Sequence, residues 1–280
     1  MINIEAAKTI LVPTDFTTVG ENALKHANLF AAKTGKSITL LHVIAAESEK
    51  EKAMQKLNAI AIANKTSHEI ETFCLTSAGT IFDQIGTVAD VINAAFVVMG
   101  THGIVGMQKV TGSKALKVIT KSHVPFIVIQ KSPAHANYNN IVIPISYQRE
   151  SKQAIFNILE LARVFGATCH LVYAHSNDEQ LEMNIYNNVA YAESFLDDNN
   201  VAHISRSLGS NLSNFNDACL SYANDVNADL ITLITEQNIT MAEFLMRPAE
   251  QFFIANNLGI PVMCIHPDYK AVQYGSVFAN

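Results

Sequence analysis

The sequence predicts an α/β protein in which one unit, a parallel sheet flanked by helices, occurs twice. Three observations support this. Short, near-continuous apolar segments alternate with helical patterns, as in parallel strands that are covered on both faces. The two halves of the 280-residue chain resemble each other. A glycine-rich loop follows one of the apolar segments, where a buried strand must turn.

The first half contains five apolar segments that we expect to be strands, at residues 8–13, 37–44, 68–75, 96–100 and 125–130. Helical patterns lie between them, and we expect helices from residue 18, over 47–64, over 80–94 and over 113–122. With right-handed crossovers, this order predicts a five-stranded parallel sheet.

Local signals set the expected ends of these helices. Thr18 and Glu21 have the spacing of a capping box, and Gly35 stands where the same helix should end. The third helix should turn one apolar face towards the sheet, formed by Ile81, Ile85, Val88 and Ile92.

The second half repeats the first with an offset of 131 residues. Ile10–Phe16 aligns with Ile141–Tyr147, and Gly35 aligns with Gly166. Further along the chain, 91–98 matches 225–232 and 124–129 matches 260–265, with small shifts that surface loops allow. We therefore expect two domains, residues 1–132 and 138–280, joined by a polar segment that contains Pro133.

Composition excludes several classes of function. The net charge of −6 comes without a cluster of lysines and arginines, which argues against a nucleic-acid partner. No apolar run approaches the ~20 residues that span a membrane, and residues 1–8 contain no signal-peptide core. The four cysteines are scattered without a CxxC pair, as in proteins of a reducing compartment. We therefore expect a cytoplasmic protein that does not contact membranes.

The glycine loop is the strongest indication of a ligand site. Glycines stand at positions 100, 103, 106 and 112, and Ser113 then begins a predicted helix. Glycine lets backbone N–H groups approach a ligand closely, and the N-terminus of a helix favours phosphate. The alternative is a plain flexible loop, because glycines also mark ordinary turns.

Three motifs in order identify a family. The chain reads Pro13-Thr14-Asp15-Phe16 after the first strand, Leu41-His42-Val43 in the second, and Met99-Gly-Thr-His-Gly103 leading to Gly112-Ser113. This combination resembles the universal stress protein family, and because both halves take part, the chain resembles a tandem member. The resemblance implies two Rossmann-like domains of the adenine nucleotide alpha hydrolase-like type.

The resemblance also implies a ligand, namely ATP, with or without Mg²⁺, or another adenine nucleotide. By resemblance, the adenine end would be lined by Pro13, Thr14, Asp15 and Val43. Ribose and phosphates would lie near Met99, Gly100, Thr101, His102 and Gly103. The phosphate oxygens would be held by Gly112, Ser113, Lys114 and Ala115. Eight residues separate Gly103 from Gly112 where the family pattern has nine, so this loop is one residue shorter.

The second half lacks this pattern. No glycine occurs in 234–250, Glu236 would face a phosphate with like charge, and Ser146 stands where the first half has Asp15. We expect no nucleotide there in the same mode. By resemblance to family dimers, the second half should pair with the first through the last strands, 126–130 and 262–266.

These residues favour a stress-response regulator or sensor that binds a nucleotide and acts on a protein partner the sequence does not identify. The alternatives are a slow or partner-stimulated ATPase and a nucleotide-free interaction or chaperone-like protein. His102 could act as a general base or simply lie beside the ligand, and Asp15 could orient a metal or water or cap a helix. We assign no catalytic residue and no metal site. The apolar tail 271–280 is a candidate contact for a homodimer.

Overall fold

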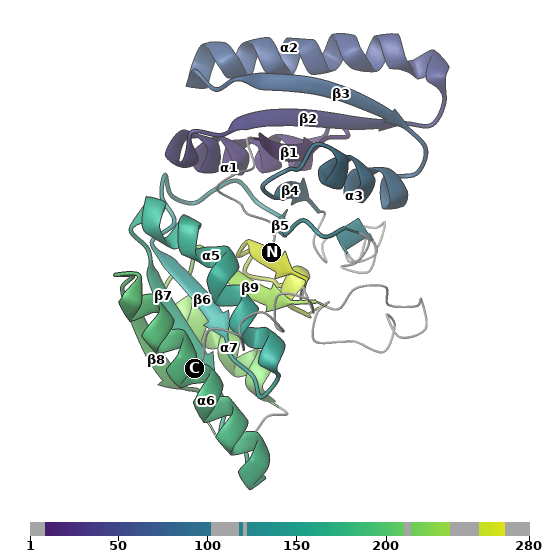
Figure 1. The fold of residues 1–280 in the computed structure, drawn as a ribbon. Coiled ribbons are helices and arrows are strands. Elements are labelled where there is room, and N and C mark those ends of the chain that lie inside the picture. The colour runs from purple at the N-terminus through teal and green to yellow at the C-terminus, as the bar shows by residue number, and fades with distance from the viewer. Residues whose placement is uncertain (1–8, 102–117, 120–121, 210–213, 236–251, 267–280) are drawn as a thin grey trace.

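The structure is a computed structural model that describes residues 9–101, 118–119, 122–209, 214–235 and 252–266. In these residues, ten strands form one sheet in the order β3-β2-β1-β4-β5-β10-β9-β6-β7-β8. The two halves of the chain lie end to end along this sheet (Figure 1).

The first half alternates strands and helices as the sequence predicts. Its elements are β1 (Thr9–Pro13), α1 (Thr18–Thr34), β2 (Ser37–Ile44), the short η1 (Glu47–Glu49), α2 (Lys50–His68), β3 (Thr72–Ala78), α3 (Ile81–Val91), β4 (Val97–Gly100) and β5 (Phe126–Ile129). Of the predicted fourth helix, 113–122, only residues 118 and 119 are described as helical.

The second half follows the same order. Its elements are β6 (Asn140–Pro144), η2 (Arg149–Ser151), α5 (Lys152–Phe165), β7 (Thr168–Tyr173), α6 (Glu179–Asp198), β8 (His203–Ser207), α7 (Phe215–Asp225), β9 (Leu230–Ile234) and β10 (Val262–Ile265).

The pairing of strands confirms the predicted sheet. Each half contributes five parallel strands in equivalent order, and β5 pairs antiparallel with β10 at the centre. There Met263 lies opposite Ile127. This confirms the expected pairing of the last strands, and it makes the two sheets continuous.

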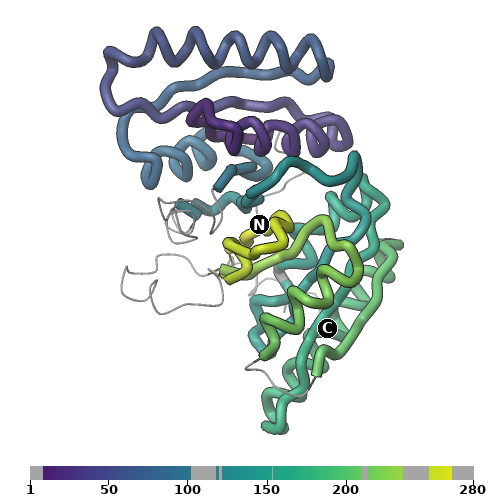
Figure 2. Tube along the Cα trace, turned by 180° about the vertical axis from the view of Figure 1, so that it is seen from behind, coloured from purple at the N-terminus to yellow at the C-terminus, as the bar shows by residue number. Residues whose placement is uncertain are grey.

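Helices cover both faces of the sheet (Figures 1 and 2). One apolar core lies under α1, α2, α5 and α6. The other lies under α3 and α7 and includes Val118, Ile119, Phe253 and Ile254. Alternate residues of each strand enter the two cores, because successive side chains of a strand point to opposite faces. Both cores contain residues from both halves, so burial is continuous across the junction.

The repeat is visible in the backbone. Gly35 and Gly166 end α1 and α5 with φ of 67° and 64°, the left-handed conformation that glycine adopts without strain. Asn93 and Asn227 likewise have φ of 49° and 50° after α3 and α7. The predicted end of the first helix at Gly35 is therefore confirmed.

Two local predictions are wrong, and a third is right only in part. The capping box at Thr18 does not form, because Thr17 is the N-cap residue and makes no side-chain cap bond. The third strand begins at Thr72 rather than 68, because α2 continues to His68 before Glu69 ends it with φ of 59°. Ile85, Val88 and Ile92 pack on the core as predicted, together with Ala89, whereas Ile81 is 48% exposed.

An aromatic cluster joins the halves. Phe30 of α1 and Phe165 of α5 both pack on Tyr138, with ring centroids 4.7 and 5.2 Å away from that of Tyr138. Nearby, Lys36 and Glu160 form an ion pair of 3.3 Å between the halves. The junction is thus a packed interface rather than a solvated linker.

Candidate functional site

The carboxyl ends of β1, β2 and β4 meet at one edge of the sheet, because these strands are parallel neighbours. Pro13, Val43 and Met99 lie there on the face that α3 covers, each two residues after a core residue of the same face. Open α/β sheets bind ligands at this edge. The structure therefore brings together three of the residues that the resemblance assigns to the nucleotide.

The turn after β1 is held by its own side chains. Asp15 is exposed, and its Oδ1 accepts hydrogen bonds from the backbone N of Thr17 at 3.0 Å and from its hydroxyl at 2.6 Å. Thr14 Oγ1 accepts from the backbone N of Phe16 at 3.1 Å, and Phe16 has φ of 65°. Asp15 thus shapes the entry to α1, as the helix-capping alternative anticipates.

His42 supports this turn from the neighbouring strand. Its Nδ1 donates to the carbonyl of Thr14 at 2.7 Å, and its ring packs on Phe16 with centroids 4.4 Å apart. His170, the histidine of β7, contacts the Tyr222 hydroxyl and Asn140 Oδ1. Both histidines have structural partners.

Two glycines let α1 approach the edge. A Cβ on Gly100 would come within 2.4 Å of Val19 Cγ1 and 2.5 Å of the Val19 carbonyl oxygen. A Cβ on Gly20 would meet Thr14 Oγ1 at 2.7 Å. Close packing against Val19 therefore requires glycine at position 100, whether or not this residue also contacts a ligand.

Thr101 begins the glycine loop. Its backbone N donates to the carbonyl of Ile129 at 2.7 Å, and the residue is buried. The other predicted phosphate-side residues, His102, Gly103, Gly112, Ser113, Lys114 and Ala115, lie outside the described residues.

The sequence did not predict a polar contact between Ser77 and Gln84, which lies at the carboxyl end of β3, beside that of β2. Ser77 Oγ donates to Gln84 Oε1 at 2.6 Å, and Gly79, with φ of 138°, lies against the Gln84 side chain. The only sequence signal was the Gly79-Thr80 pair before a helix, which also marks ordinary turns.

The second half keeps the backbone of this edge but changes its side chains. Thr235 N donates to the carbonyl of Ile265 at 2.9 Å, as Thr101 does to Ile129. Ser146 Oγ accepts from Gln148 N at 3.2 Å, in the manner of Asp15 and Thr17. A carboxylate is therefore replaced by a hydroxyl while the turn is retained.

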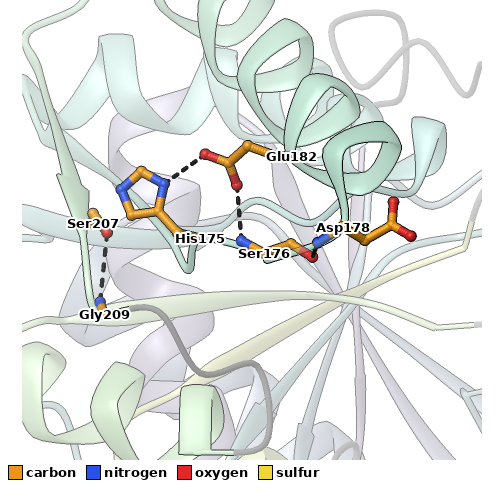
Figure 3. A network of polar contacts seen from close by, with 6 residues as sticks. All are labelled: His175, Ser176, Asp178, Glu182, Ser207 and Gly209. Atoms are coloured by element: carbon orange, nitrogen blue, oxygen red, sulfur yellow. Dashed lines mark hydrogen bonds and ion pairs between the residues drawn. The ribbon is translucent and has the colours of Figure 1, made fainter.

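A polar network follows β7 (Figure 3). Glu182 accepts from His175 Nδ1 at 2.6 Å and from Ser176 N at 2.8 Å, and these bonds lower the pKa of its carboxyl, the bond from Ser176 most. In the first half, Glu49 accepts from Ala45 N at 3.0 Å in the equivalent loop. Because both halves tie this loop to the next helix in the same way, the network is structural.

Among the residues that the structure describes, no three potential metal ligands form a cluster, and no helix could span a membrane.

Residues 6–130 match the model of the Universal stress protein family. Through these residues, the first half of the chain is similar to universal stress proteins. A curated universal stress protein of Methanocaldococcus jannaschii is 27% identical over 154 residues, which are 44% of this chain and 95% of that protein.

Solved structures extend the likeness of fold to the whole chain. A universal stress protein of Archaeoglobus fulgidus matches with a TM-score of 0.78 at 16% identity, covering 94% of this chain and all of that one. A functionally unknown protein of Pseudomonas aeruginosa matches with a TM-score of 0.67 at 13% identity, covering 97% of this chain and 96% of that one. Both halves of the chain therefore have the Rossmann-like fold of these known structures.

Proposed function

We propose that the first half binds ATP or a related adenine nucleotide at the carboxyl edge of β1, β2 and β4, and that the chain acts as a stress-response regulator or sensor. The main support is the placement of Pro13, Val43 and Met99 on one face at that edge. The family match covers the same strands and the glycine loop.

The residues at the edge suit an adenine nucleotide. Pro13, Val43 and Met99 offer the apolar contact that a flat base requires, and the exposed carboxylate of Asp15 can accept hydrogen bonds. Backbone N–H groups of 112–115 would hold the phosphate oxygens, as the resemblance implies. Mg²⁺, where bound, would neutralise charge on the phosphates.

The second half serves as a structural partner in this proposal. Ser146 stands where the first half has Asp15, so the turn after β6 carries no carboxylate at this position. Residues 236–250, which follow Thr235, contain no glycine. We therefore expect one nucleotide per chain. The domain boundaries 1–132 and 138–280 remain part of the proposal. Buried free thiols at Cys169 and Cys219 support a cytoplasmic location.

Nucleotide released from freshly purified, denatured protein tests the proposal. We expect about one equivalent of an adenine nucleotide per chain. Ser113→Glu should reduce affinity at least about tenfold, because it places a carboxylate against phosphate. Thr66→Glu adds the same charge on the exposed side of α2 and should leave affinity unchanged. An empty protein that also fails to bind added ATP would contradict the proposal and favour a nucleotide-free interaction protein.

The same variants distinguish a regulator from an ATPase. If the protein is a regulator, wild-type protein should release phosphate from ATP no faster than the variant Ser113→Glu does. Phosphate release over many turnovers that disappears in Ser113→Glu, but not in Thr66→Glu, would instead make the protein an ATPase.

A further inference from the structure

His266, the residue after the central strand β10, connects the second half to the first. Its Nε2 lies 2.5 Å from the carbonyl oxygen of Ile119, and its Nδ1 lies 2.9 Å from the hydroxyl of Thr235. A carbonyl only accepts, so Nε2 carries the proton. Nδ1 also lies 3.4 Å from the carbonyl oxygen of Thr235. The imidazole is buried, with 7% of its surface exposed.

The equivalent residue of the first half makes the reciprocal contact. Gln130 follows β5, and its Nε2 donates to the carbonyls of Ile254 at 3.0 Å and Asn256 at 3.2 Å. Residues 252–254 are helical, as are 118 and 119. Each half thus hydrogen-bonds, through the residue after its central strand, to the end of the other half's last helical segment.

We propose that His266 is a positioning residue for the nucleotide site of the first half: it anchors, from the second half, the end of the segment that begins at the predicted phosphate-binding Ser113. This inference rests on the proposed function. It gives the second half a role in binding although its own glycine loop is lost.

Ser113 precedes Ile119 by only six residues in the sequence, so a contact that fixes the position of Ile119 limits where Ser113 can lie. Carbonyls in the last turn of a helix lack partners within the helix, so a donor from outside decides where that end lies. Ile119 is fully buried, and its carbonyl otherwise accepts only a longer bond, 3.3 Å, from Ser122 N among the described contacts.

The surroundings of His266 favour its neutral form. Burial lowers the pKa of the imidazole, which the contacts with the backbone carbonyls of Ile119 and Thr235 partly oppose. Asp90 of α3 and His123 act on it electrostatically with opposite sign. The bond to the Ile119 carbonyl requires a proton on Nε2.

ATP affinity of the full chain, measured well below the unfolding temperature, tests this role. We expect His266→Ala to weaken ATP binding about three- to thirtyfold, the range of coupling through a contact outside the site. His266→Gln should restore most of the affinity, because Gln130 makes the equivalent bond in the other half. Thr235→Val, which removes only the hydroxyl that orients Nδ1, should have a smaller effect and provides the test if His266→Ala does not fold.

His26→Ala is the matched control. His26 is also a buried histidine at the junction, bonded through Nδ1 to the Tyr138 hydroxyl and through Nε2 to the carbonyl of Lys131, but on the opposite face of the sheet. The variant His26→Ala should lower the free energy of unfolding and leave ATP affinity unchanged. Unchanged affinity in both His266→Ala and Thr235→Val, or equal losses in His266→Ala and His26→Ala, would overturn the inference.

Hydrogen exchange separates this inference from the proposed function. In protein without nucleotide, His266→Ala should speed exchange of the amides in 118–124, whereas His26→Ala should not. If wild-type protein binds no ATP, the proposed function fails. The anchoring contact is then judged by exchange alone, and unaltered exchange in 118–124 would overturn it as well.

Discussion

At Gly100, packing and ligand binding both explain why the residue is a glycine. The sequence pattern attributes it to phosphate binding, whereas the structure places the Val19 backbone where a Cβ would lie. Gly20 shows the same principle, because α1 crosses close to Thr14. Single-residue patterns could not reveal these contacts, since they depend on how α1 packs on the sheet.

Gly100→Ala should therefore destabilise the fold with or without nucleotide. The added methyl would overlap backbone atoms, and we expect a loss of about 2 to 3 kcal/mol in the free energy of unfolding. Gly20→Ala should cost less, because its closest contact is the Thr14 side chain. Chemical denaturation measures both, and a Gly100→Ala variant as stable as wild type would show that α1 can move aside.

His26 should make stability depend on pH. Burial lowers the pKa of this imidazole from 6.5 to about 4, partly opposed by its bond to the Lys131 carbonyl. Between these values the unfolded chain binds a proton that the folded chain does not. The contribution of neutral His26 to stability is therefore fully present above pH 6.5. As the pH drops to 4, this contribution to the free energy of unfolding should fall by about 3 kcal/mol.

Denaturation curves at several pH values, compared between wild type and His26→Gln, measure this contribution. The difference between the two proteins should change between pH 6.5 and 4 and stay constant above pH 7. A constant difference over the whole range would contradict a neutral, buried His26.

Among the elements, those with strong apolar patterns were predictable. β1, β2 and β4 lie within a residue of the predicted segments, and the repeat correctly aligned Gly35 with Gly166. The boundaries that failed depend on competition between local signals. Asp15 bonds to Thr17, which is the N-cap residue of α1. α2 continues to His68, the first residue of the segment that was expected to be the third strand.

The two helix ends at Gly35 and Gly166 should respond alike to substitution. A Cβ would have no neighbour within 4 Å at either position, so alanine should cost only the left-handed strain, about 1 kcal/mol each. Thermal or chemical unfolding of Gly35→Ala, Gly166→Ala and the double variant measures this. Costs that are unequal, or that do not add, would contradict equivalent and independent caps.

In the whole molecule, the two halves share their cores and their sheet. The sequence repeat predicted two similar halves, and the family resemblance implied that their last strands pair. Neither could predict which side chains of the two halves are in contact. Phe30, Tyr138 and Phe165, or His266 and Ile119, are far apart in the sequence and meet only because the halves pack. The phosphate side of the site stays a prediction from sequence.

The first half alone, residues 1–132, should therefore not be a stable monomer. Its fully buried strand β5 would become an open edge, which tends to pair with another strand. We expect dimers or larger species by light scattering, and Val128→Lys should suppress them by placing a charge in that edge. A monomer with the wild-type β5 would show that the halves fold independently.

Equilibrium titration of nucleotide-free protein with ATP measures how many nucleotides one chain binds. We expect saturable binding of one ATP per chain, because only the first half combines the apolar edge with the glycine loop. Two bound nucleotides per chain, or none, would contradict it.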